Sequence, residues 1–104
     1  MFKVSILYPN KEGTHFDMDY YVRVHMPMVQ ARLTPLGLKG VSAEKGISAG
    51  TAGSQAPFHC MGHLLFESLD AYMAGMKAHG RALGGDIPKF TNATPVFQIS
   101  EIVS

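Results

Sequence analysis

Two strand-like runs of the sequence, residues 2–8 and 59–67, have apolar side chains on both faces. Successive side chains of a strand point to opposite faces, so alternate positions form two sets. In the first run Val4, Ile6 and Tyr8 point one way and Leu7 points the other way. In the second run Cys60, Leu64 and Phe66 lie opposite Met61 and Leu65. A sheet that is covered on both faces gives this pattern. Because one layer of helices covers only one face, we expect the other face to pack against a second subunit.

Two further strand-like segments, 40–48 and 95–103, bring the expected number of strands to four. A helix is predicted before the last of them, with Ser68 as its N-cap and a stop at Gly84 and Gly85. Its apolar residues recur at the spacing of one helical stripe: Leu69, Tyr72, Met73, Met76 and Leu83.

The segment 16–33 has two interpretations. From Phe16 to Met28 its apolar residues alternate with period two, which is typical of a strand. A helix is also possible, with Asp17 as N-cap and Gly37 as stop, although Pro27 would kink or break it. We favour the helix because so long an alternating strand would be unusual.

The resulting order is strand, helix, strand, strand, helix, strand. This order predicts an α+β fold, the ferredoxin-like βαββαβ arrangement, with a four-stranded antiparallel sheet and both helices on one face. With 104 residues, 46% of them hydrophobic, the chain is expected to form one domain over residues 1–104.

Composition excludes several classes of partner. With nine basic and eight acidic residues, the chain lacks the excess of positive charge that binding to nucleic acid requires. No apolar run reaches the roughly 20 residues that cross a bilayer, and the N-terminus has no leader-like segment. The single cysteine, Cys60, excludes an internal disulfide and is expected to be a buried, inert thiol. We therefore expect a soluble, cytoplasmic protein without nucleic-acid or membrane partners.

Histidines are the main candidates for chemistry. If the first helix forms, Tyr21 and His25 are four residues apart and share a face. An imidazole beside a phenol in apolar surroundings can transfer protons near neutral pH. The alternative is that His25 is an ordinary surface histidine. His59 and His63 would lie about 13 Å apart on one strand, too far to share a metal, so no metal site is expected.

His79 follows Tyr72 by seven residues, so both fall on nearly the same side of the second helix. This pair could present a base and a hydroxyl to one cavity. The alternative is that His79 is a rim residue beside Gly80.

The sequence resembles the EthD family, named for ethyl tert-butyl ether degradation. The stretch 16–21 (FDMDYY), followed by His25 and Pro27 in an H-x-P element, is similar to the family signature. Similar segments are 4–10, 61–64, 85–92 and 95–102, and the third of these includes G-D-I-P. The resemblance is specific because the H-x-P and G-D-I-P elements occur together, and it covers nearly the whole chain.

The resemblance implies a dimeric α+β barrel, in which two ferredoxin-like subunits pack sheet to sheet. Its superfamily includes cofactor-free monooxygenases, polyketide cyclases and muconolactone-isomerase-like enzymes, with a pocket between sheet and helices. His25 matches the histidine of the H-x-P element, and His79 matches a histidine on the second helix. The reaction of the EthD family itself is not established.

We expect a homodimer that binds a small hydrophobic molecule. The first hypothesis is an enzyme without cofactors, an oxidoreductase or monooxygenase, or a cyclase or isomerase, acting on a small apolar or aromatic compound in a catabolic pathway. His25 would act as base or acid, Tyr21 would orient it, and His79 with Tyr72 would stabilise an oxyanion. The expected substrate contacts are Tyr20, Phe66, Tyr72 and Met76.

The alternative hypothesis is a non-catalytic binder or carrier that assists a partner oxygenase. The surroundings of the histidines distinguish the two. A ring nitrogen that faces the cavity without a protein partner favours an enzyme, whereas a histidine with both nitrogens bonded to protein groups favours a carrier.

Overall fold

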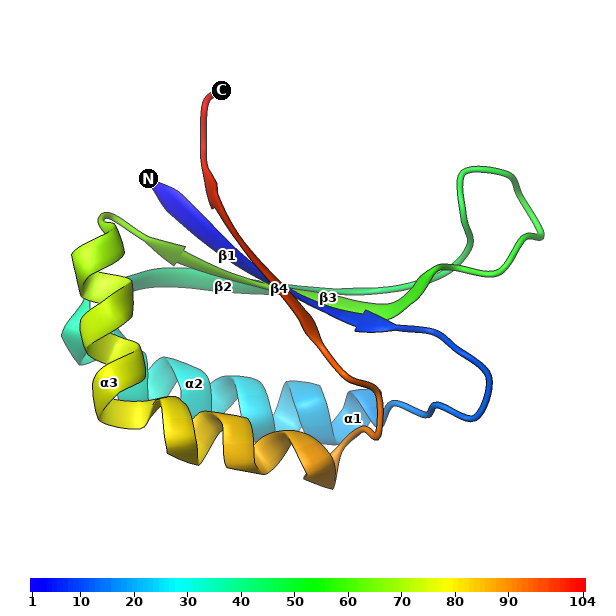
Figure 1. Cartoon of the computed structure of the whole chain (residues 1–104), viewed down its shortest axis with the longest axis horizontal. Coiled ribbons are helices and arrows are strands. Elements are labelled where there is room, and N and C mark those ends of the chain that lie inside the picture. Colours follow the sequence, from blue (N-terminus) through cyan, green and yellow to red (C-terminus); the bar gives the residue numbers. More distant parts are fainter.

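Four antiparallel strands form one sheet with the order β2-β3-β1-β4 in the computed structural model, which describes all 104 residues (Figure 1). The central strands β1 and β3 pair along their whole length, with Val4 opposite Leu64. The strand bounds are β1 Phe2–Pro9, β2 Leu38–Lys45, β3 Phe58–Phe66 and β4 Val96–Glu101. This sheet order and the element order confirm the predicted ferredoxin-like α+β fold.

Two helical segments cover one face of the sheet and lie side by side (Figure 1). The first runs from α1 (Met18–Tyr20) through a π-helical turn (Tyr21–His25) into α2 (Met26–Leu33). The second is α3 (Leu69–Asp86), which continues into a short 3-10 turn (Ile87–Lys89). None of these helices has the length and apolar character needed to span a membrane.

The first helical segment confirms the choice of a helix over a strand. The Asp17 carboxylate accepts a hydrogen bond from the Tyr20 backbone N–H, and Gly37 ends the segment with a left-handed φ of 108°. Pro27 does not break the helix, which continues through it, but the regular α-helical hydrogen bonding is interrupted by the π-helical turn directly before the proline. The N–H of Met26 donates to the carbonyl of Tyr21, five residues back, and this wider turn relieves the clash that the proline ring would cause in a regular α-helix.

Ser68 caps α3 as predicted, since its hydroxyl accepts from the N–H of Ala71 at 3.1 Å. The predicted stop at Gly84 and Gly85 is wrong, because neither glycine has a positive φ and the helix runs on to Asp86. A glycine ends a helix only where the backbone turns left-handed.

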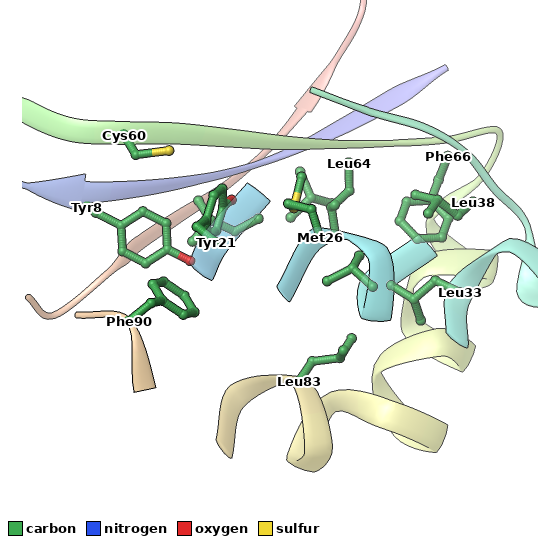
Figure 2. Close-up of a cluster of buried hydrophobic side chains, with 13 residues drawn as sticks. Tyr8, Tyr21, Met26, Leu33, Leu38, Cys60, Leu64, Phe66, Leu83 and Phe90 are labelled. Atoms are coloured by element: carbon green, nitrogen blue, oxygen red, sulfur yellow. The ribbon is translucent and has the colours of Figure 1, made fainter. Parts of the chain in front are cut away.

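The core lies between the sheet and the helices (Figure 2). Alternate residues of β1 and β3 pack there against Tyr21, Leu33 and Leu83 of the helices. The opposite face of the sheet has no covering element, and it carries Leu7, Met61, Leu65 and Val96. The two-sided apolar pattern therefore corresponds to one buried face and one open face.

Candidate active site

A cavity of about 100 Å³ lies between the sheet and the two helical segments. Twelve of its fifteen lining residues are hydrophobic. Strand β1, the π-helical turn, α2 and α3 supply most of the wall, and Phe97 of β4 completes it. The exposed members of the lining are Gly84 and Phe97, so the cavity opens between α3 and β4.

His25 and Asp86 form a buried pair at the edge of this cavity. The Nδ1 atom of His25 lies 2.9 Å from Oδ2 of Asp86, and the two residues are only 6% and 7% exposed. His25 is the last residue of the π-helical turn, and Asp86 is the last residue of α3. The pair thus joins the ends of two elements that are 61 residues apart in the sequence.

The Asp86 carboxylate has two hydrogen-bond donors and one ion-pair partner. Besides His25, the Tyr20 hydroxyl donates to Oδ1 at 2.8 Å, and Lys89 Nζ lies 3.6 Å from the same oxygen. Burial alone would raise the pKa of Asp86, but hydrogen bonds from His25 and Tyr20 and attraction to Lys89 outweigh it, so the pKa is below its ordinary value of 3.8. Asp86 is therefore ionised at neutral pH.

The ionised carboxylate determines which nitrogen of His25 carries the proton. Because a carboxylate only accepts hydrogen bonds, Nδ1 of His25 must be the donor. No protein group bonds to Nε2, although every fully buried side-chain nitrogen and oxygen atom has a partner. Nε2 is therefore accessible, and His25 belongs to the cavity wall. In the neutral imidazole with the proton on Nδ1, Nε2 carries a free lone pair.

Aromatic rings hold the imidazole in place. The Tyr21 ring stacks on His25 with centroids 5.5 Å apart and an 18° angle between the planes, and the Phe90 ring lies 4.7 Å away. Figure 2 shows Tyr8, Tyr21 and Phe90 in one cluster below the sheet. Burial raises the pKa of both Tyr8 and Tyr21 far above the ordinary value, so both phenols remain protonated donors.

The structure brings together only some of the residues expected at the site. Tyr21, His25, Tyr72 and Met76 line the cavity. Tyr20, Phe66 and His79 lie outside the lining. Tyr20 holds Asp86 instead, and Phe66 is fully buried against the Tyr72 ring, 5.6 Å away.

His79 is also outside the cavity wall, and its Nδ1 lies 3.4 Å from an Arg32 nitrogen of α2. The lining stripe of α3 continues from Met76 through Gly80 and Gly84. His79 lies beside this stripe, on the side that faces α2. The seven-residue spacing from Tyr72 therefore predicted the approximate side of the helix, but His79 does not line the cavity.

Asp86 and Tyr8 are the site residues that the sequence analysis missed as such. Asp86 has a signal that could have been used. Asp86 belongs to the G-D-I-P element, which occurs together with the H-x-P element of His25, and this co-occurrence relates the two residues. Burial raises the pKa of Cys60 to about 12, and the thiol remains protonated and outside the lining.

The fold and the site define a class: a ferredoxin-like α+β domain with a buried His–Asp pair beside an apolar cavity. The EthD domain model matches residues 14–94, and the chain belongs to this family. An EthD-like protein of Ralstonia eutropha JMP134 is 39% identical, with a TM-score of 0.92 over 99% of this chain and 92% of that chain.

Two more distant structures show the same fold. A dimeric ferredoxin-like protein from an uncultured marine organism is 14% identical, with a TM-score of 0.64 over 100% of this chain and 96% of that chain. A candidate monooxygenase of Shewanella loihica PV-4 is 8% identical, with a TM-score of 0.65 over 99% and 94% of the two chains. Among curated proteins, no sequence matches significantly.

Proposed function

We propose that this EthD domain protein is an enzyme that needs no cofactor and moves a proton on a small, apolar, enolisable compound. The observation that carries the proposal is the free Nε2 of buried His25, whose Nδ1 is held by Asp86 2.9 Å away. A histidine with one nitrogen oriented by a carboxylate and the other directed to a cavity is the usual arrangement of a general base.

In the proposed reaction, Nε2 of His25 removes a proton from the carbon next to a carbonyl group. The electron pair of the broken C–H bond moves to the carbonyl oxygen and forms an enolate. Asp86 stabilises the imidazolium that results, and a protonated phenol, Tyr8 or Tyr21, donates a hydrogen bond to the oxygen. Return of the proton from His25 to the same carbon restores the carbonyl compound, whereas in a compound with a C=C bond next to that carbon, return to the far end of the dienolate gives the conjugated isomer. Either return restores the neutral imidazole.

This assignment changes the expected roles of several residues. Asp86, rather than Tyr21, orients His25, while Tyr21 stacks on the imidazole. Tyr72 and Met76 remain proposed substrate contacts. His79 has no part in the proposed reaction, because it lies outside the cavity wall.

The second candidate function is a carrier of small hydrophobic molecules that assists an oxygenase. The mainly hydrophobic wall, with twelve apolar residues among fifteen, supports binding of such a molecule without chemistry. The free Nε2 favours the enzyme, because a carrier gains nothing from an unsatisfied polar atom beside an apolar ligand.

We also propose that the open face of the sheet meets a second copy of the chain. The apolar residues on this face support a homodimer, as does the dimeric state given for the ferredoxin-like relative from the marine organism. Each protomer contains a whole cavity, so the proposed chemistry does not require the partner's residues.

Deuterium uptake by phenylacetone in D2O, followed by proton NMR, tests the proposed reaction. We expect the protein to accelerate exchange of the hydrogens next to the carbonyl. His25→Asn should reduce the acceleration by roughly 10²–10⁴-fold, whereas the control His79→Asn should leave it within a factor of two. Binding of phenylacetone without any acceleration of exchange would contradict the enzyme and support the carrier.

A further inference from the structure

Two glycines of α3 border the cavity where a side chain would have room. An added Cβ at Gly84 would meet no atom within 4 Å, and one at Gly80 would make ordinary contacts with Met76 at 3.7 and 3.8 Å. Close packing therefore does not explain either glycine. Gly75 of the same helix differs, since its Cβ would come within 3.0 Å of Leu33.

Glycine inside a helix is also unfavourable, because it increases the entropy lost on folding. Gly80 and Gly84 lie one helical turn apart, and both belong to the cavity wall. The absence of a side chain at these two positions leaves this part of the cavity unfilled. A larger side chain at Gly84 would occupy the opening between α3 and β4.

The opposite side of this opening is formed by Phe97, which is 55% exposed and lies in the wall of the cavity. Phe97 pairs with Ile6 of β1, so its ring is on the face of the sheet that the helices cover. The opening therefore has an aromatic ring on the β4 side and, at Gly80 and Gly84, two positions without a side chain on the α3 side, and we call this part of the cavity the slot.

The size of the cavity limits what can enter. A dry engineered cavity of about 150 Å³ in another protein holds one benzene ring. The cavity here, about 100 Å³ and open at one side, is in the range of a single ring that reaches into the opening. The residues of the lining that carry polar side-chain groups are His25, Tyr8, Tyr21 and Tyr72, and the first three belong to one aromatic cluster.

We propose that Gly80 and Gly84 are specificity-determining residues that restrict the protein to compounds with one ring, or an apolar body of that size, bearing a single carbonyl group. The ring lies in the slot between Phe97 and the two glycines, and the carbonyl end reaches Nε2 of His25. This inference rests on the proposed function for the role of the carbonyl, but the slot itself makes a separate prediction about binding.

The test is a ¹⁹F NMR titration with 4-fluorophenylacetone, a one-ring ketone, and with a fluorinated naphthylacetone, its two-ring analogue. Gly84→Leu should weaken binding of the one-ring ketone by roughly tenfold or more, and Gly84→Ala by less. The wild-type protein should bind the two-ring ketone at least about tenfold more weakly than the one-ring ketone.

Gly85 offers a matched control. It is the next residue of α3, is exposed, has the same open space around an added Cβ, and does not line the cavity. Gly85→Ala and Gly85→Leu should leave both affinities within a factor of two. Both alanine variants should melt a few degrees higher than the wild type, which shows that any loss of binding is not a loss of folding.

Three results would overturn the proposal: unchanged binding in Gly84→Leu, an equal loss in Gly85→Leu, or no saturable binding of the one-ring ketone to the wild type. Failure of the proposed function gives a different result. In that case the glycine variants still change binding as expected, but neither the wild type nor His25→Asn accelerates deuterium exchange.

Discussion

Asp86 occupies a position where a carboxylate needs support from the rest of the fold. It is buried, and it is the last residue of α3, where the helix dipole favours positive charge. His25, Tyr20 and Lys89 supply that support. The contacts that keep the carboxylate ionised also keep the proton of His25 on Nδ1. Both the packing at the end of α3 and the proposed chemistry therefore depend on Asp86.

Asp86→Asn should lower the free energy of unfolding by about 1–3 kcal/mol near neutral pH, because a charge-assisted hydrogen bond is replaced by a neutral one. The folded-state pKa of Asp86 is below its unfolded value of 3.8. Its contribution is therefore present above that pH and is lost as the pH falls through the folded pKa. Urea denaturation should show the two proteins converging below pH 3.8, and a difference that grows in acid would contradict this account.

Gly62 of β3 is required by a close approach. A Cβ at this position would lie 2.0 Å from the Tyr21 hydroxyl oxygen, which cannot be accommodated without a shift of the ring. Gly62→Ala should therefore cost about 1–3 kcal/mol of stability by overpacking. Gly40→Ala in β2 is the control, because an added Cβ there meets no atom within 4 Å.

A double variant tests this explanation directly. Tyr21→Phe removes the hydroxyl, so Gly62→Ala should cost less in the Tyr21→Phe background than in the wild type. Thermal or urea unfolding of the four proteins measures this coupling. Equal costs in both backgrounds would show that the hydroxyl does not cause the loss.

At the scale of elements, the sequence predicts the helices and strands well where local chemistry sets them. Asp17 and Ser68 cap the helices as expected, and Gly37 supplies the expected stop. Local rules also allow an end to the helix at Pro27 and Gly84, but the chain stays helical past both residues. At both places tertiary packing extends it, through a π-helical turn at the first and through the contacts of Asp86 at the second.

The candidate site could be predicted only in part, for the same reason. The four-residue spacing of Tyr21 and His25 survives in the π-helical turn, and these rings stack. Asp86 lies 61 residues from His25, and no periodicity relates the ends of two different helices. His79 shows the converse case, because its spacing from Tyr72 gives a side of the helix but not the position of the neighbouring α2.

The whole molecule is flat, because one sheet and one helical layer make up its entire thickness. The Cα extents are 40 × 34 × 19 Å, and the radius of gyration is 14.0 Å. A typical chain of this length has a radius of gyration of about 13 Å. The excess fits a protomer that leaves one sheet face without a cover (Figure 1).

Three polar side chains on the open face bond to one another within the protomer. His63 bonds to the Ser5 hydroxyl and to the Glu44 carboxylate, each at 2.8 Å. Such a face can lose its water without leaving these side chains unpaired, and its apolar residues supply the favourable free energy. This combination supports the proposed second copy over a permanently hydrated surface.

Light scattering should report about twice the protomer mass of 11.3 kDa at micromolar concentration. Met61→Lys should shift the protein to the monomer, because it places a charge in the middle of the proposed interface. Its folding should be preserved, since Glu44 lies directly opposite on β2 and can pair with the new ammonium group. Met73→Lys on α3, at a residue that is 62% exposed on the other side of the molecule, is the control and should leave the dimer intact. A wild-type mass of 11.3 kDa, or equal dissociation by both substitutions, would show that the sheet face is not where two copies meet.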